Sequence, residues 1–256
     1  KKHPYGKNAL ASQKAIDLME NSILEIENNM VLVNGGDFEM GSNLYEGYPL
    51  GGYPPHNVSI PTFYIGTHEI TQIQWRAVMN NNAPHLRFNG CDQCPVDCVG
   101  WNDLHEFIKQ LNHITGKIYR LPSEAEWEFS ARGGNLSRNY EFSGSDSLGA
   151  VAWYGENSDN KTHPVGTKLP NELGIYDMSG NVYEWVQDCF NKSYVGAPVD
   201  GSAWSYGDCS KSVIRGGEYM DAGLTCVTVI RSLSLRDTTL LSAGVYAAGF
   251  RLARNY

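Results

Sequence analysis

The chain has 256 residues, a mass of 28.4 kDa and a net charge of −8. This length allows one large domain or two small ones, and it is enough to bury a core without help from disulfides. Mean hydropathy is −0.37, and no apolar run approaches the roughly 18 residues that a membrane helix needs, so we expect no transmembrane segment. The negative charge argues against nucleic acid as a partner, because contacts with phosphates need a basic surface.

Apolar residues that recur at helical spacing predict four helices. The predicted helices lie at 8–27, at 71–80, at about 102–114 and from residue 123 onward. The last of them opens with a capping box, because Ser123 can cap the helix and Glu126 follows three residues later. Short strands are predicted at 30–34, 38–40, 56–60 and 63–65. From residue 133 onward, frequent Gly, Ser, Asn and Asp predict loops without a long helix.

We therefore predict an α+β fold in which residues 1–29 form a helical N-terminal extension and residues 30–256 form one loop-rich domain. Common catalytic motifs do not occur in the sequence: it has no P-loop, no GxGxxG after a strand and no GxSxG. Two His-Glu pairs, at 68–69 and 105–106, begin like the zinc motif HExxH. Neither has the second histidine one turn later, so a zinc-protease site is not expected.

Five of the six cysteines form two groups. Cys91, Cys94 and Cys98 have the spacing C-x2-C-x3-C, but a zinc site would need a fourth soft ligand that the sequence does not offer. Either a loop tied by a disulfide or free thiols is expected there. Cys189 and Cys209 flank a loop of nineteen residues. In an oxidising environment, a disulfide between them would stabilise the folded state by ~3 kcal/mol. We predict that this pair forms a disulfide.

An ordered set of short motifs includes GDFEMGS, RLPSEAEWE, GIYDMSGNVYEW and GFRL. The segments of the set lie at 30–42, 63–64, 69–71, 94–96 with Trp101, 120–128, 131–134, 163–166, 174–185, 213–217 and 249–252. Together they resemble the formylglycine-generating-enzyme family, also called the sulfatase-modifying factor family. The resemblance implies a C-type lectin fold, loop-rich and with short strands, over residues 30–256.

The oxidases of that family bind copper(I) through two cysteines, since a soft metal prefers thiolates. The resemblance places these cysteines just after the RGG motif and five residues apart. Here Cys226 matches the second cysteine, whereas Asp221 replaces the first. A single thiol cannot form a two-thiolate site, so we expect no copper, no catalytic residues and no enzymatic activity. The alternative is a copper-dependent formylglycine-generating oxidase or a degenerate relative of it.

The resemblance also implies one calcium site in the GIYDMSGNVYEW turn. Asp177 and Glu184 would supply side-chain oxygens. Gly180 and Val182 would supply backbone carbonyl oxygens, and a hard cation prefers such donors. The alternative is that Asp177 caps a turn and Glu184 pairs with an arginine such as Arg215. A calcium-stabilised module with no ligand of its own is a further interpretation of the chain.

Residues 218–248 contain no Asn, Gln, Lys, His or Pro and are rich in Leu, Ser, Thr, Val and Ala. This composition resembles the C-terminal segment of the variable proteins of diversity-generating retroelements, in which adenine-directed mutagenesis rewrites Asn codons. Within that class the likeness is to the treponemal variable lipoproteins, which have the same type of scaffold. The alternative is a degenerate family member whose segment packs inside the domain.

The resemblance implies a ligand-binding, receptor-like protein whose variable region 218–248 forms the recognition site. It implies an extracytoplasmic location at the cell surface, as a lipoprotein whose anchor lies outside this chain. The partner would be a protein or a small ligand, and an apolar patch favours a protein or an apolar ligand over a sugar. The side chains expected to be exposed and to contact the ligand are Tyr219, Asp221, Leu224, Ile230, Leu233, Leu235, Leu240, Val245 and Tyr246.

Overall fold

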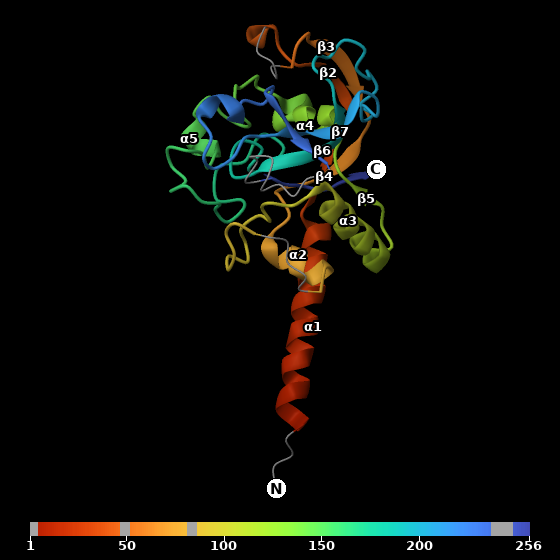
Figure 1. The fold of residues 1–256 in the computed structure, drawn as a ribbon, viewed down its shortest axis with the longest axis vertical. Coiled ribbons are helices and arrows are strands. Elements are labelled where there is room, and N and C mark those ends of the chain that lie inside the picture. Colours follow the sequence, from red (N-terminus) through yellow and green to blue (C-terminus); the bar gives the residue numbers. More distant parts are fainter. Residues whose placement is uncertain (1–4, 47–51, 81–85, 237–247) are drawn as a thin grey trace.

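A long N-terminal helix, α1 (Tyr5–Asn28), projects from the rounded body that holds the other elements (Figure 1). The computed structural model describes residues 5–46, 52–80, 86–236 and 248–256. Near the C-terminal end of α1, Ile26 is buried and Ile23 packs against the same apolar cluster, which joins the helix to the body. The helix predicted at 8–27 is therefore present.

The described strands form three small β-sheets. The first has the order β1-β4-β10-β5 and consists of β1 (Met30–Val33), β4 (Phe63–Gly66), β10 (Ala253–Asn255) and β5 (Tyr119–Arg120). The second pairs β2 (Gly36–Met40) with β3 (His56–Ile60). The third has the order β8-β7-β6-β9 and consists of β8 (Arg231–Leu235), β7 (Asp208–Arg215), β6 (Tyr183–Phe190) and β9 (Ala248–Gly249). Because β10 pairs with β4, the last strand of the chain lies beside one of the first.

The four predicted strands are present as β1 to β4, whereas the two longest strands, β6 and β7, were not predicted. In β6 every residue except Tyr183 and Gln187 is buried, and the C-terminal half of β7 is buried as well. These strands therefore lack the alternation of buried and exposed positions by which a half-buried strand is found in a sequence.

Among the residues that the structure describes, four α-helices follow α1, and three short 3-10 helices lie between the other elements. The α-helices are α2 (Gln72–Val78), α3 (Trp101–Thr115), α4 (Glu124–Ala131) and α5 (Leu148–Val151); the 3-10 helices are η1 (Asn43–Tyr45), η2 (Gly134–Leu136) and η3 (Gly223–Cys226). The capping box predicted for α4 is present, since Ser123 Oγ accepts from the N–H of Glu126 at 3.1 Å and Glu126 Oε2 accepts from the N–H of Ser123 at 2.9 Å. Every residue of α4 is buried, so its carboxylates lie inside the protein.

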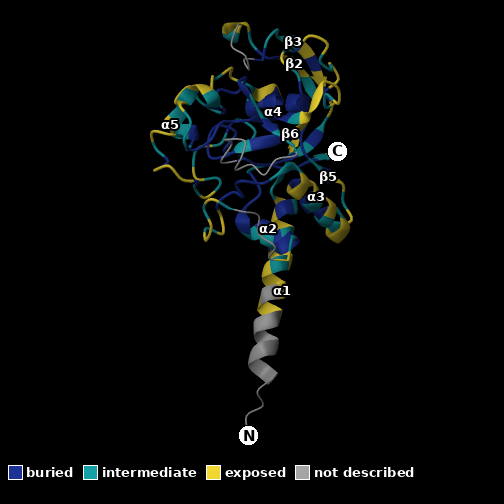
Figure 2. Cartoon of the chain, viewed as in Figure 1, coloured by how far each residue is buried: buried dark blue, intermediate teal, exposed yellow. Residues whose placement is uncertain are grey.

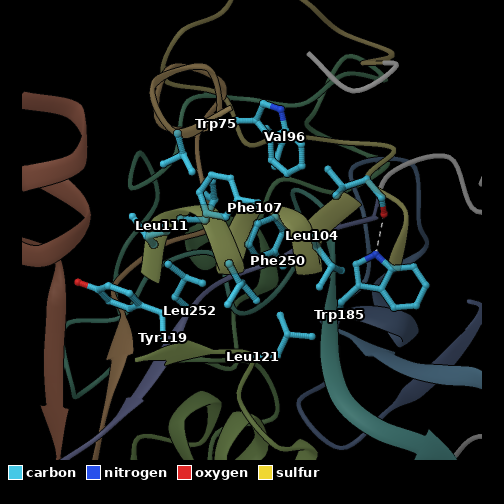
Figure 3. Close-up of a cluster of buried hydrophobic side chains, with 14 of the residues drawn as sticks. Trp75, Val96, Leu104, Phe107, Leu111, Tyr119, Leu121, Trp185, Phe250 and Leu252 are labelled. Carbon is cyan, nitrogen blue, oxygen red and sulfur yellow. Dashed lines mark hydrogen bonds between the residues drawn. The ribbon is translucent and has the colours of Figure 1, made fainter. Parts of the chain in front are cut away.

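Buried residues fill the interior of the body (Figure 2). Its apolar side chains form two main clusters. In the first, Trp75 stacks on Phe107 with ring centroids 5.1 Å apart, and Phe250 meets both rings edge-on (Figure 3). Trp185 belongs to this cluster, and its indole N–H donates to the carbonyl of Val99 at 2.8 Å (Figure 3). The second cluster, around α4, β2 and β3, completes the core.

Two disulfides constrain loops at the surface of the body. Cys189 and Cys209, the pair predicted from the sequence, are joined and close the loop between β6 and β7. Cys91 and Cys94 are also joined, which resolves the open alternatives for the C-x2-C-x3-C group. The remaining thiols, of Cys98 and Cys226, are buried.

Candidate functional site

The segment predicted to recognise a ligand starts at a double-glycine turn after β7. Gly216 and Gly217 have positive φ angles, 96° and 76°. A Cβ on Gly217 would lie 2.9 Å from Sγ of Cys226, so only glycine fits at this position. The turn holds the start of the segment against η3, and the structure describes the segment as far as residue 236.

Buried donors of the scaffold hold the backbone of the segment. Ser179 Oγ donates to the carbonyl of Cys226 at 2.8 Å. The guanidinium of Arg215 donates to the carbonyls of Thr228 and Val229 at 2.8 and 3.2 Å. These bonds involve main-chain oxygens of the segment, so the path of this stretch does not depend on the identity of the side chains that it carries.

Arg231, the first residue of β8, is the charged side chain that anchors the segment. It is 2% exposed, and its Nε and Nη2 atoms donate to the two carboxylate oxygens of Glu124 at 2.6 and 2.9 Å. The hydroxyl of Tyr194 donates to the same carboxylate at 2.9 Å. Because Glu124 is the first residue of α4, this ion pair fastens β8 to a fully buried helix.

Two of the predicted contact positions are buried, and the expectation that they are exposed is wrong. Tyr219 is 0% exposed and packs against Phe88 and Val182. Ile230 is 3% exposed and packs against Val229 and its neighbours. Both side chains contribute to apolar clusters, so part of the segment does pack inside the domain.

The other described contact positions reach the surface or lie at its edge. Leu224 is 44% exposed. Asp221, Leu233 and Leu235 are half-buried, and Leu233 also packs against the second core cluster. The remaining predicted positions lie outside the described residues: Leu240, Val245 and Tyr246.

A cavity of about 630 Å³ opens beside the end of β8, and the sequence did not predict it. The guanidinium of Arg236 lies over the ring of Trp101 at 3.9 Å from its centroid and forms one wall. Other lining residues are His105, Arg120, Gln187, Asp200 and Cys209. They come from α3, β5, β6 and the disulfide-closed loop, which are far apart in the chain, so no local pattern could have revealed the cavity.

Beneath the segment lies a group of buried ions that we call the paired charge centre: Glu124, Glu128, Asp188, Arg215 and Arg231. Arg215 Nη2 donates to Glu128 Oε2 at 2.6 Å. The carboxylate of Asp188 accepts from two main-chain N–H groups, each at 2.7 Å. Burial, assisted by the charge of Glu124, raises the pKa of Asp188 to about 7. Every carboxylate oxygen of this centre has a donor.

The two side chains predicted to bind calcium, Asp177 and Glu184, differ in whether their carboxylate oxygens already have hydrogen-bond partners. Asp177, at a φ of 56°, accepts from the N–H of Gly166 through Oδ2 at 2.7 Å, while its buried Oδ1 has no hydrogen-bond partner. Glu184 is fully buried and accepts from Nε and Nη2 of Arg251, both at 2.7 Å. The indole N–H of Trp127 donates to it as well, at 2.9 Å. Asp177 therefore fits a cation ligand, whereas the carboxylate of Glu184 is already engaged.

The arginine that pairs with Glu184 is thus Arg251 and not Arg215, which the sequence had suggested. Gly180 lies in the same turn at a φ of 82°, and the side chain of Val182 is buried. Within the described ranges of the chain, no three His, Cys, Asp or Glu side chains are grouped so that they alone would hold a metal ion.

A further buried carboxylate belongs to this region, and the sequence had shown it only as part of an incomplete zinc motif. Glu69 is 0% exposed, and neither of its carboxylate oxygens has a hydrogen-bond partner. Burial, and next the charge of Asp177, raises the pKa of Glu69 well above its usual value. We call Glu69, Asp177, Glu184 and Arg251 the unbalanced charge centre, because three carboxylates share one guanidinium.

The two positions that the resemblance aligns with the family's copper cysteines, Asp221 and Cys226, lie in the turn before η3 and at the end of η3. Asp221 Oδ2 accepts from the N–H of Glu218 at 3.0 Å and so closes the turn before η3. Cys226 is fully buried, and burial together with the charges of Asp221 and Glu218 raises the pKa of its thiol to about 12.

The chain belongs to the sulfatase-modifying factor enzyme 1-like domain family, whose sequence model matches residues 16–256. It is 34% identical over 210 residues to the chaperone protein LppX of Paenibacillus barcinonensis, covering 62% of this chain and 71% of that relative. It is 27% identical over 251 residues to the formylglycine-generating enzyme of Streptomyces coelicolor, covering 74% of this chain and 78% of the enzyme.

Two solved structures are similar over most of the chain. PvdO from Pseudomonas aeruginosa has a TM-score of 0.76 and 32% sequence identity, covering 89% of this chain and 94% of PvdO. Treponema denticola variable protein 1 has a TM-score of 0.76 and 28% identity, covering 89% of this chain and 95% of that protein. The α+β fold is thus the C-type-lectin-like fold of the formylglycine-generating-enzyme family, and the resemblance found in the sequence is confirmed.

The similar proteins include both an enzyme and a variable protein, which supports a non-catalytic or degenerate member of the family. Across the described part of the chain, none of the helices has the length and apolar character that crossing a membrane requires.

Proposed function

We propose that this chain is a receptor-like, ligand-binding protein in which residues 218–248 form a diversified recognition site on a lectin-type scaffold. The observation that carries the proposal is that the scaffold holds the main chain of the described part of the segment, while some of its side chains reach the surface. Scaffold donors hold its main chain at 226–229, and Arg231 fastens it to α4. A rigid scaffold that presents changeable side chains is typical of binding loops.

The outward positions favour recognition of a protein surface or an apolar ligand. Leu224 exposes 44% of its surface, and Leu235 is half-buried at the end of β8. Exposed apolar side chains of a binding segment serve as contact area for a ligand. The cavity under Arg236 adjoins the same end of β8 and offers a recess in which a projecting group of the ligand would be held.

The residues at the copper positions support a non-catalytic role. Asp221 is a hydrogen-bond acceptor that closes a turn in place of a second thiol, and Cys226 is buried. We propose an extracytoplasmic location at the cell surface, as a lipoprotein, since disulfides such as Cys91–Cys94 and Cys189–Cys209 persist in oxidising compartments.

Sequencing the gene and its flanking DNA in several isolates tests the proposal. We expect changes to cluster in codons 218–248, to spare the codon of Arg231, and to be accompanied by a near-copy template and a reverse transcriptase gene. A uniform segment without a template overturns the proposal.

The enzymatic alternative is tested by titration with copper(I). The wild-type protein is expected to show no tight copper(I) binding, whereas Asp221→Cys supplies the second thiol and is the matched gain-of-binding control. Tight binding by the wild type, together with oxidation of a cysteine-containing sulfatase peptide, would instead support the oxidase.

A further inference from the structure

Strand β8, which lies within the proposed recognition segment, is at an edge of its sheet. The strand order β8-β7-β6-β9 places β7 on one side of β8, and on the other side no described strand is paired with it. An edge strand presents main-chain N–H and C=O groups that no neighbouring strand uses. The sheet can therefore be extended by one more strand at β8.

The register of β8 against β7 shows which of its main-chain groups point outward. Leu235 lies opposite Lys211, and the N–H of Arg236 donates to the carbonyl of Ser210 at 2.9 Å. In an antiparallel ladder, hydrogen-bonded pairs of residues alternate with pairs that are not hydrogen-bonded. The even-numbered residues of β8 are therefore the ones bonded to β7. The main-chain groups that point away from β7 belong to Arg231, Leu233 and Leu235.

These outward groups need a partner of a particular kind when a ligand covers them. Within the described parts of the chain, no other main-chain group is hydrogen-bonded to the N–H or C=O of these three residues. Leu233 and Leu235 are half-buried, so this edge of the sheet reaches the surface. Burying main-chain polar groups without hydrogen bonds is unfavourable, so a ligand on this edge must offer donors and acceptors in the same alternation. An extended peptide offers them with its own main chain.

We propose that the ligand is a protein that presents an extended peptide strand, and that this strand pairs with the outer edge of β8. The inference rests on the proposed function, because β8 lies within residues 218–248. Side chains of the added strand lie beside Leu233 and Leu235, which favours apolar or β-branched residues at alternate positions of the ligand. Arg236, the residue after β8, lines the cavity described above, so a ligand strand that continues past Leu235 meets this cavity.

Pairing through the main chain suits a segment whose side chains change. The outward hydrogen bonds use atoms that every residue except proline carries, so they persist when Leu233 or Leu235 is replaced. The ion pair between Arg231 and Glu124 holds the strand in place. The edge thus supplies affinity that is common to all variants of the segment, and the side chains select among ligand strands.

Hydrogen exchange of single amides, followed by NMR on the intact chain, tests the open edge without a ligand. We expect the amides of Ser232 and Ser234 to exchange at least about ten-fold more slowly than those of Leu233 and Leu235, because only the first two donate to β7. Equal protection of all four amides would show that the edge is already covered and would overturn the proposal. A dimer that forms as the concentration rises and protects Leu233 and Leu235 would assign the edge to a second copy of the chain instead.

The probe for a ligand is a display library of linear peptides of about ten residues, selected on the wild-type chain. Selected peptides should slow exchange at Leu233 and Leu235. An N-methyl group placed along such a peptide should weaken binding at every second residue, because only alternate N–H groups face β8. Peptides that bind to the segment without this alternation would refute strand pairing and leave the recognition site in place. Peptides that bind only elsewhere, or a library without binders, would count against both.

The variant Leu235→Pro separates main-chain pairing from side-chain contact. It removes an outward N–H and keeps the ladder to β7, a change that an edge strand tolerates. The matched control, Leu235→Ala, removes the side chain and keeps that N–H. We expect the affinity of a selected peptide to be about five-fold or more lower for Leu235→Pro than for Leu235→Ala, which corresponds to the loss of one hydrogen bond. Equal affinities of the two variants would contradict pairing at β8.

Discussion

The paired and the unbalanced charge centres lie in the same core but differ in how their carboxylates are satisfied. In the paired centre, Glu124 and Glu128 face Arg231 and Arg215, and the oxygens of Asp188 are bound by main-chain N–H groups. The carboxylates of this first centre are all hydrogen-bonded within the chain, and its ion pair with Arg231 fastens the proposed recognition segment.

In the unbalanced centre, of the three carboxylates the guanidinium of Arg251 binds only that of Glu184. Both oxygens of Glu69 and one oxygen of Asp177 are buried without a hydrogen-bond partner.

The largest expected effect is the loss of Arg231. Arg231→Met leaves the carboxylate of Glu124 buried without its guanidinium, and breaking a buried pair in this way costs about 3 to 5 kcal/mol. Urea unfolding of the variant measures this loss, and Arg138→Met, at an exposed position, is the control that should cost less than about 0.5 kcal/mol. A cost for Arg231→Met no larger than that of the control would mean that the pair does not anchor β8.

The next effect concerns the disulfide beside the paired centre. The loop closed by Cys189 and Cys209 carries Trp204, whose N–H donates to Asp188. Replacing both cysteines by serine should lower the free energy of unfolding by about 3 kcal/mol, and by roughly 2 kcal/mol for Cys91 and Cys94, because the closed loop is shorter. Equal losses for the two pairs would show that loop length does not determine the stabilisation.

The titration of Glu218 should make the free energy of unfolding depend on pH, with an effect of intermediate size. Burial, with the charges of Asp221 and Asp97, raises its pKa to about 7 from the ordinary 4.5. The folded state therefore keeps a proton that the unfolded state releases, so this group makes stability fall as the pH rises from about 4.5 to about 7. Glu218→Gln should be more stable than the wild type at pH 8, by about 1 to 2 kcal/mol, and nearly equal to it at pH 4.5. Urea unfolding at both pH values measures the difference, and parallel pH profiles would contradict it.

The smallest effect on stability is expected at the outward positions of the segment. Leu224→Ala removes an exposed side chain and should change the free energy of unfolding by less than about 0.5 kcal/mol. Tyr219→Ala, at a buried position of the same segment, should cost about 3 to 5 kcal/mol. Thermal and urea unfolding of the two variants measure this contrast. A large loss at Leu224 would mean that it belongs to the core and is not a contact position.

Local patterns in the sequence predicted those elements whose residues meet their partners nearby in the chain. The capping box of α4 needs only Ser123 and Glu126, and strands β2 and β3 alternate between more and less exposed positions. Strand β6 was missed because both of its faces are buried. The exposure of Tyr219 was predicted wrongly for a similar reason, since the partners that bury it, Phe88 and Val182, come from distant segments.

The ordered motifs of the sequence were sufficient to assign the family and the lectin-type fold, because each motif carries its own turn, cap or anchor. They were also sufficient to show Asp221 in place of a copper cysteine. The choice of charge partners was not contained in them: that Glu184 pairs with Arg251, and that Glu69 lies unpaired beside Asp177, follows only from the packing of segments distant in the chain. Coulomb interactions depend on distance in space and on burial, neither of which a linear pattern specifies.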